Sequence, residues 1–243
     1  MSFIEKPNLP AGRVRTCIVS AREPAIIKSL GAMGITCLSS YDKAGCENAV
    51  AAHADVNALH LGNGEIVIGD SCEALEDTLI SLGLNVKIES LGDREYPKDC
   101  ALNALIVDNC VFCREELCSQ QVKSHCDNIH NVRQGYTKCS TAVVDENAFI
   151  TSDIGIYGAL KSMGYDVLKI TGGEIALRGY DTGLIGGTCA KLAKDILCFS
   201  GKIDDTSFGS DIRAFCRSHG IYIETLTEMP LFDFGGIVAF EEE

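Results

Sequence analysis

The sequence predicts an α/β fold of five strand–strand–helix–strand units that close on themselves like the blades of a propeller. Three observations predict this fold. A helix-ending phrase containing glycine recurs along the chain, a pair of short strands precedes each such helix, and the two ends of the chain supply complementary parts of a fifth unit. Recurrence of one supersecondary unit is the sequence signature of repeat architectures.

Each predicted helix ends in a small residue, one further residue and a glycine, and a new apolar run follows. The phrase occurs as SLGLNVKI, SMGYDVLKI, SHGIYIETL and AMGITCL, which contain Gly83, Gly164, Gly220 and Gly34. A degenerate copy, SHCDNIHNV, begins at Ser124. Glycine adopts positive φ without steric cost and therefore ends helices readily. We expect a strand to begin after each of these helix ends.

Two short apolar runs joined by turn residues come before the helices. They read NALHLGNGEIVIG, NALIVDNCVFC, STAVVDENAFIT and CAKLAKDILCFSG, and begin at Asn57, Asn103, Ser140 and Cys189. Turn residues between β-favouring runs predict β-hairpins. Four complete units are therefore predicted, at about residues 55–90, 101–132, 139–171 and 185–227.

The two ends of the chain supply the fifth unit. The run GGIVAF within residues 233–243 is a first strand without a partner. Residues 13–40 contain a second strand, RVRTCIVS, a helix opened by Glu23 and Pro24, and a third strand, ITCLSS. Pairing the last strand with the first removes an exposed sheet edge and closes the ring. We expect one domain over residues 1–243.

The composition is that of a globular protein without a basic face. The chain has 46% hydrophobic and 23% charged residues, a net charge of −13 and a pI near 4.8. Binding to nucleic acid or to an anionic membrane requires clustered positive charge, so neither partner is expected. The N-terminus lacks the features of a signal peptide, and no apolar run reaches the length of a membrane span. A cytoplasmic, bacterial protein is the prediction.

The 13 cysteines follow no disulfide framework, and a cytoplasmic location keeps them reduced. The densest group is CVFCREELCSQQVKSHC, with Cys110, Cys113, Cys118 and Cys126. Cys110 and Cys113 fall on a predicted strand, where residues three apart point to opposite faces. We therefore expect small buried hydrophobes here, no metal site and no cofactor.

Five such units resemble the pentein, or α/β-propeller, superfamily, and in particular an uncharacterised bacterial branch of it. The resemblance implies a pseudo-fivefold axis and a central channel, with the residues that lead into the first strands meeting at its mouth. The fold is shared by guanidino-modifying enzymes and by a ribosome anti-association factor. The enzymes carry Arg-Asp, Gly-Gly-Asp, His-x-Asp and a nucleophilic Cys at these positions. Their chemistry requires a thiolate, a proton-transferring His and carboxylates that hold the planar cation.

This chain departs from the enzyme pattern. The second unit has Asp99 with Lys98 in the place of Arg, and the third lacks Gly-Gly-Asp. Ile237 stands in the last unit where the thiol is expected. All five histidines lie outside the expected position: His53, His60, His125, His130 and His219. Whether the protein is an enzyme stays open, and a function without catalysis is favoured.

A polar column is nevertheless predicted at the channel. Aligning the hairpins places Asn57, Asn103, Ser140, Cys189 and Gly236 at one equivalent position. One interpretation is a water-filled channel lining that satisfies buried polar groups. The other is a binding site for a small polar metabolite, of the amine or guanidinium type. Its candidate residues are Asp99, Asn103, Asn57, Ser140, Thr188, Cys189 and Asp233.

Two alternatives to a metabolite-binding protein stay open. In the first, the chain is a guanidino-modifying hydrolase or transferase whose nucleophile is displaced to Cys189. The nearby Lys191 and Lys194 would favour its thiolate, because a cation lowers a thiol pKa. In the second, the chain is a protein-interaction module similar to the anti-association factor. The sequence contains no signal for the oligomeric state.

Overall fold

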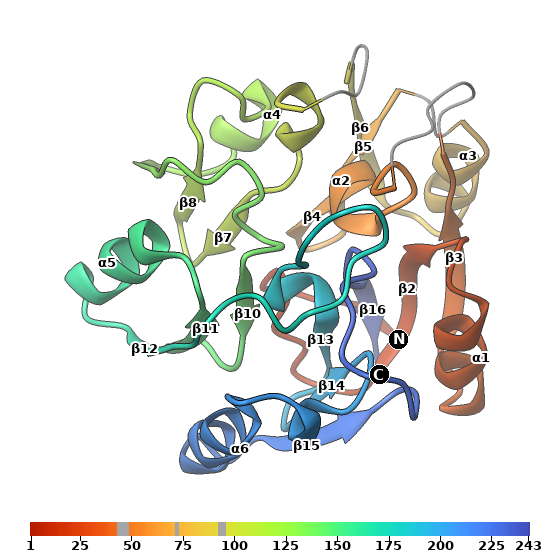
Figure 1. Ribbon diagram of the computed structural model, residues 1–243. Helices are drawn as coiled ribbons and strands as arrows, with labels where there is room; N and C mark the ends of the chain where they lie inside the picture. Colours follow the sequence, from red (N-terminus) through yellow and green to blue (C-terminus); the bar gives the residue numbers. More distant parts are fainter. Residues whose placement is uncertain (43–48, 71–72, 92–95) are drawn as a thin grey trace.

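The computed structural model describes residues 1–42, 49–70, 73–91 and 96–243, and within these ranges the strands form five small sheets (Figure 1). Four of the sheets have three strands each. They are β4 (Ala58–Gly62), β5 (Glu65–Gly69) and β6 (Asn85–Glu89); β7 (Leu105–Val107), β8 (Cys110–Cys113) and β9 (Asn128–Asn131); β10 (Thr141–Val143), β11 (Ala148–Thr151) and β12 (Asp166–Lys169); and β13 (Cys189–Ala193), β14 (Ile196–Phe199) and β15 (Tyr222–Thr225).

Every one of these four sheets has the predicted internal order. The first two strands form an antiparallel hairpin, and the third pairs with the second in parallel. Parallel neighbours require a crossover connection, and a helix provides it in each unit. These helices are α3 (Glu73–Ser81), α4 (Gln120–Lys123), α5 (Ile154–Ser162) and α6 (Gly209–Ser218). The strand–strand–helix–strand unit expected from the sequence is confirmed.

The fifth sheet joins the two ends of the chain. The last strand, β16 (Val238–Glu242), pairs antiparallel with β2 (Val14–Ser20). Helix α1 (Pro24–Ala32) then leads to β3 (Thr36–Ser40), which runs parallel to β2. The pairing of the terminal segments is therefore present in the structure. The sequence did not indicate β1 (Ser2–Phe3), which covers the other edge of β16.

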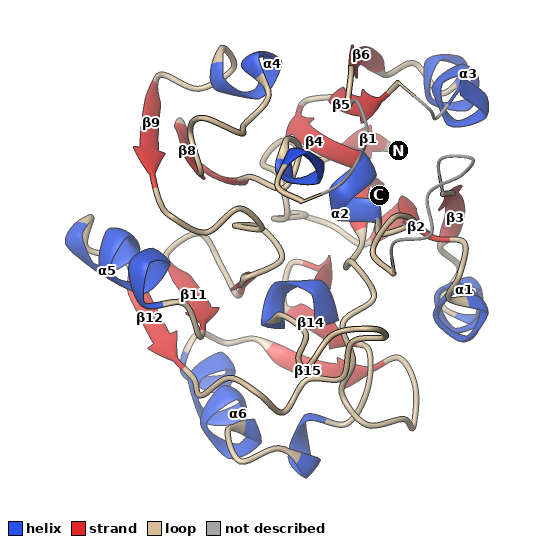
Figure 2. Cartoon of the chain, turned by 45° about the horizontal axis from the view of Figure 1, so that its top comes forward, coloured by secondary structure: helices blue, strands red, loops and turns tan. Residues whose placement is uncertain are grey.

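Positive-φ glycines end the helices as predicted. Gly34, Gly83, Gly164 and Gly220 have φ between 71° and 91°, and a strand follows each one. A residue with Cβ is strained in this region, so the glycine ends the helix at a defined place. The crossover helices α1, α3, α4, α5 and α6 lie on the periphery, whereas α2 (Ala54–Asn57) lies near the centre (Figure 2).

Neighbouring units share hydrophobic clusters. One cluster joins Phe112 of β8 to Phe149 of β11 and Ile156 of α5, and these three side chains are buried. Another joins Phe240 of β16 to Ile66 of β5. Because apolar surface of one unit is buried against the next, each unit depends on its neighbours for stability.

The N-terminal segment crosses the ends of the hairpins. The Asn63 amide donates to the Ile4 carbonyl at 2.9 Å, and Lys6 Nζ lies 3.2 Å from Glu146 Oε2. Asn8 has φ of 65°, a left-handed conformation that asparagine tolerates better than most residues. In the described part of the chain, no helix combines the length and apolar character needed to cross a membrane.

Candidate functional site

Five short segments, one before each first strand, carry several of the buried polar side chains in the described part of the chain, and we call them lead-in segments. Three of them are short helices, namely α2 (Ala54–Asn57), η1 (Lys98–Cys100) and η2 (Ile185–Thr188). The other two are residues 136–140 before β10 and residues 233–237 before β16. Hydrogen bonds connect these segments to one another, so residues far apart in sequence form one site.

Asp233 is the centre of this site. Its carboxylate accepts hydrogen bonds from the backbone amides of Leu184 (2.9 Å) and Gly235 (3.0 Å). The Cys139 thiol lies 3.5 Å from Oδ2 of Asp233, and Nδ1 of His53 lies 3.9 Å from Oδ1. A thiol, an imidazole and a carboxylate thus meet from three lead-in segments.

Gly187 permits this close approach. A Cβ atom at this position would stand 2.1 Å from Oδ1 of Asp233 and 2.5 Å from the sulfur of Cys139. Neither contact is sterically tolerable, and Asp233 is itself fixed by two backbone donors. The site therefore requires a residue without Cβ at position 187.

Asn103 connects the segment of Cys139 to that of Asp55. Its side-chain oxygen accepts from the Cys139 amide at 2.9 Å, and its side-chain nitrogen donates to the Asp55 carbonyl at 3.2 Å. The Asp55 amide in turn donates to the Gly235 carbonyl at 3.2 Å. These bonds hold Asp55 beside Cys139 and Asp233. We call Asp55, Asp233, Cys139 and His53 the carboxylate cluster.

Asp55 is the most unusual member of the carboxylate cluster. Its side chain is 4% exposed, and neither carboxylate oxygen has a partner at full hydrogen-bond geometry, although the Cys139 thiol and the Asn103 amide lie close enough to lower its pKa slightly. Burial, and secondly the nearby Asp233 carboxylate, raise the pKa of Asp55 to about 7, against the opposing effect of Lys138. A buried carboxylate without donors costs several kcal/mol when ionised, so this group is poised to gain from a cation or a proton.

The thiol and the imidazole are both neutral in this environment. Burial raises the pKa of Cys139 well above its usual value, and the Asp233 and Asp55 carboxylates raise it further. Burial lowers the pKa of His53, although Asp233 opposes this effect. At neutral pH the carboxylate cluster therefore holds a protonated thiol and an uncharged imidazole.

Asp99 lies in a second polar group beside the cluster. The Tyr136 hydroxyl donates to Oδ2 of Asp99 at 2.5 Å, and the Cys100 thiol lies 3.6 Å from Oδ1. Burial raises the pKa of Asp99, and the hydrogen bond from Tyr136 partly offsets this. The exposed Tyr96 ring packs on Tyr136 with centroids 5.9 Å apart. Asp99 is thus already satisfied, unlike Asp55.

The remaining predicted site residues mainly contact the backbone in or near their own lead-in segments. The Asn57 amide donates to the carbonyls of Ala51 (2.7 Å) and His53 (2.9 Å), and the Thr188 hydroxyl donates to its own turn at Ile185 (2.7 Å). The Ser140 hydroxyl is buried without a partner. These residues lie in the lead-in segments as expected, and what they bind stays a prediction.

The lysines near Cys189 predicted a lowered thiol pKa, and the structure does not provide that environment. The side chain of Cys189 is 2% exposed, and its thiol contacts the Ile185 carbonyl at 3.5 Å. Burial raises the pKa of Cys189 to about 12, and the opposing effect of Lys138 is smaller. The thiol therefore stays protonated, and Cys139 is the better placed of the two.

The expectation that all histidines lie away from the site is wrong for His53. This residue begins the sequence His53-Ala54-Asp55, which has the His-x-Asp form of the guanidino-modifying enzymes. The signal was present, but His53 and Ala54 precede the predicted start of the first unit at residue 55. His53, Asp55 and Cys139 are the site residues that were missed.

The described side chains do not form a metal-binding cluster. Within the described ranges, no group of three or more His, Cys, Asp and Glu side chains has a metal-binding arrangement. The four cysteines of the densest sequence cluster instead lie in or beside apolar packing, where Cys113, Cys118 and Cys126 join Val111 and Leu102.

The fold matches solved enzyme structures over nearly the whole chain. One is SxtG, an amidinotransferase of Microseira wollei in saxitoxin biosynthesis, with a TM-score of 0.61, 10% identity and coverage of 99% of this chain and 97% of that one. Another is the inosamine-phosphate amidinotransferase StrB1 of Streptomyces griseus, with a TM-score of 0.61, 9% identity and coverage of 100% and 97%. The agmatine deiminase of C. jejuni matches with a TM-score of 0.55, 8% identity and 90% coverage of both chains.

These proteins are members of the pentein superfamily, so the resemblance inferred from the repeats is confirmed at the level of fold. Identities of 8–10% carry the fold and not the activity. No curated protein matches the chain in sequence. A family model matches residues 18–238, and its description is a family of unknown function (DUF6873).

Proposed function

The chain belongs to this family of unknown function (DUF6873), and we propose that it binds a small cationic metabolite at the carboxylate cluster. The group bound is a guanidinium or amine. The observation that carries the proposal is Asp55, a carboxylate that is 4% exposed and has no partner on either oxygen. A structure that leaves such a group unsatisfied gains free energy from any cation that reaches it.

The charges of the site favour a cation over an anion. Asp55 and Asp233 both face Cys139, and His53 contributes no positive charge because burial lowers its pKa. Lys138 is the nearest basic side chain that acts on Asp55, and it only partly offsets the two carboxylates. The net charge of −13 adds a negative electrostatic potential, which also favours a cation.

Geometry favours a guanidinium over a simple amine. A planar guanidinium donates two parallel hydrogen bonds to one carboxylate, and both oxygens of Asp55 are available for this bidentate contact. An ammonium group is a point charge and would leave one of the two oxygens without a donor. The ligand class is proposed from Asp55 and Asp233, and the agmatine deiminase of the same fold gives one example of a protein named for a substrate of this class.

The proposal places the five units in one domain, around a central channel with a pseudo-fivefold axis. The pairing of β16 with β2 supports this arrangement, because it completes a fifth unit from the two ends of the chain. The bonds between lead-in segments also support it, since residues 53–55, 103, 139 and 233 belong to different units. In this arrangement the carboxylate cluster lies at the mouth of the channel.

Covalent chemistry at Cys139 is the second candidate function, and the contact of its thiol with Asp233 favours it. A cation bound between Asp55 and Asp233 neutralises the charges that keep the thiol protonated, so its pKa falls. The thiol proton would pass to the uncharged His53 imidazole, and the sulfur would attack the guanidinium carbon. The S–C bond forms, a C–N bond breaks, and the amine leaves with the proton from His53.

Thermal-shift measurements test the binding proposal. The compounds are arginine, agmatine, creatine and spermidine, with urea as a neutral planar control. Ligand at 100 times its dissociation constant stabilises a protein by about 2.7 kcal/mol. We expect a shift with at least one cation and none with urea, and Asp55→Asn should abolish it. Asp77→Asn, an exposed change on α3, should leave the shift intact, and an unchanged shift in Asp55→Asn would rule out this site.

Two cysteine variants separate binding from catalysis. If Cys139 is a nucleophile, Cys139→Ser keeps the thermal shift but loses turnover of the bound guanidine and the covalent adduct seen by mass spectrometry. Cys189→Ala serves as the matched control, and it should retain both. Binding without turnover or adduct in the wild-type protein would establish a binding function alone.

A further inference from the structure

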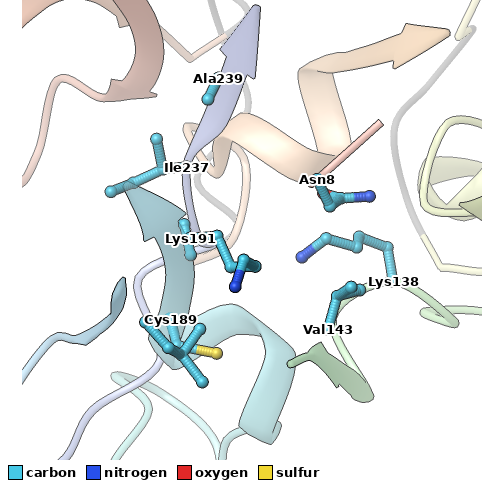
Figure 3. A pocket seen from close by; sticks show the side chains of 9 residues that line it. Asn8, Lys138, Val143, Cys189, Lys191, Ile237 and Ala239 are labelled. Atoms are coloured by element: carbon cyan, nitrogen blue, oxygen red, sulfur yellow. The ribbon is translucent and has the colours of Figure 1, made fainter. Parts of the chain in front are cut away.

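Two small cavities lie behind the carboxylate cluster, and polar side chains line both. The first cavity is lined by Asp55, His60, Lys138 and Asn8, together with apolar residues of β4 and β16. The second is lined by Lys138, Lys191, Cys189 and Asn8. Lys138, Asn8, Ile237 and Ala239 line both, so the two cavities adjoin. In Figure 3 the side chains of Lys138 and Lys191 extend toward one another between Asn8 and Cys189.

The polar groups around these cavities lack sufficient protein partners. His60 is 3% exposed, and neither of its ring nitrogens has a hydrogen-bond partner. Both oxygens of Asp55 are in the same condition. The Lys138 ammonium contacts the Gly186 carbonyl only at 3.5 Å, the outer limit for a hydrogen bond. Each unsatisfied buried group costs about 1–3 kcal/mol, so a dry channel would be strongly disfavoured.

The volume of the cavities determines what can occupy them. Each has about 10 Å³ for a water-sized occupant, which is about the minimum for one water molecule. Buried water commonly makes about three hydrogen bonds. The first cavity offers Asp55, His60, Lys138 and Asn8, and the second offers the two lysines and Asn8. The polar partners and the space of these two cavities both match water.

We propose that the two cavities hold a chain of buried water molecules that connects Asp55, through His60 and Lys138, to Lys191. Lys191 also lines a surface groove of about 780 Å³ on the side of the hairpin ends, formed in part by the N-terminal segment. The water chain thus gives the carboxylate cluster a path for protons toward this groove, on the side away from the lead-in segments. Protons exchange with Asp55 by this route.

Asn8 closes the channel at the side of the hairpin ends. Its backbone is left-handed, with φ of 65°. This conformation forms the turn that brings Lys6 and Leu9 together in an antiparallel bridge. Its side chain lines both cavities and so separates the buried water from the groove. Bulk water is therefore kept out, and proton movement depends on Lys191. The ammonium of Lys191 donates to the Val144 carbonyl at 2.8 Å, and burial lowers its pKa to about 8.

The test counts long-lived internal water by magnetic relaxation dispersion and locates it in a crystal structure that resolves ordered solvent. We expect at least two internal water molecules in the wild-type protein, one in each cavity. Ala239→Val places two methyl groups where Ala239 lines both cavities, and should displace at least one. Ala193→Val is the matched control, because Ala193 is equally buried on β13 and lines neither cavity.

The same variants report on the connection to Asp55. Loss of channel water removes solvation from the Asp55 carboxylate, so Ala239→Val should raise its pKa, measured by carbon NMR of the carboxyl group. His60→Leu removes two of the water partners and should act in the same direction, whereas Ala193→Val should not. Empty wild-type cavities, or an Asp55 titration equal in all variants, would overturn the inference. This inference does not depend on the proposed function, because channel water is measured without any ligand.

Discussion

Replacing Asp55 with asparagine should change the pH dependence of stability in a predictable direction. The pKa of this carboxyl rises from 3.8 to about 7 in the folded protein, mainly because of burial. Such a rise corresponds to about 4 kcal/mol of unfavourable ionisation. Asp55→Asn keeps the size and polarity of the side chain but cannot ionise, so the variant escapes this cost.

The sign follows from proton binding. Between about pH 4 and pH 7 the folded protein retains the Asp55 proton while the unfolded chain has lost it, so the contribution of this group falls as pH rises. The stabilising contribution of Asp55 is fully present below the pKa of the group in the unfolded chain, 3.8. It is lost as the pH rises through the pKa in the folded protein, about 7. We therefore expect Asp55→Asn to be more stable than the wild-type protein at pH 8 by up to about 4 kcal/mol, with a much smaller difference near pH 4.

Urea unfolding at pH 4, 5, 6, 7 and 8 measures this difference without adding charge. Asp77→Asn controls for the loss of one negative charge, because Asp77 is exposed on α3. Its free energy of unfolding should parallel that of the wild-type protein. Parallel curves for Asp55→Asn and wild type would refute the reasoning, because they would show that Asp55 ionises without cost in the folded state.

Three further predictions concern packing, closure and thiol reactivity. Gly187→Ala forces a Cβ atom to within 2.1 Å of Asp233 and should lower the free energy of unfolding by about 1–3 kcal/mol. Gly158→Ala, in open space on α5, should raise it by about 1 kcal/mol. Urea unfolding of the two variants measures both changes. Deleting residues 237–243 removes β16 and should abolish cooperative unfolding, and a truncated chain as stable as the full one would contradict the closure of the fifth sheet. At pH 6.5 iodoacetamide should modify half-buried Cys37 before buried Cys189. If mass spectrometry shows that Cys189 is modified first, Cys189 becomes the better candidate for a nucleophile.

The architecture could be predicted because its signals are local. Glycines that end helices, turn residues between apolar runs and an unpartnered last strand each act over a few residues. The positive φ of Gly83 or Gly164 and the pairing of β16 with β2 follow from those signals. The β1 strand escaped prediction, because two residues carry no period and pair only when β16 is already in place.

The candidate site was predicted in part for the same reason. The lead-in segments were located through the hairpins that follow them, and Asn103 and Asp233 were named from those positions. His53 and Asp55 precede their hairpin by a short helix that the repeat pattern does not contain. Cys189 aligns with Ser140, one residue after Cys139, so the repeat pattern directed attention to the wrong one of the two thiols.

By itself the sequence determined the repeated unit, its five-fold occurrence and the pairing of the chain ends, because hydrogen-bonding patterns and backbone preferences act between near neighbours. Only the tertiary structure decided which polar residues form a site. Asp55, Cys139 and Asp233 come together across three units, and their protonation depends on burial and on one another. Electrostatic interactions in a low-dielectric interior act through space over a few ångströms, and sequence separation does not encode that distance.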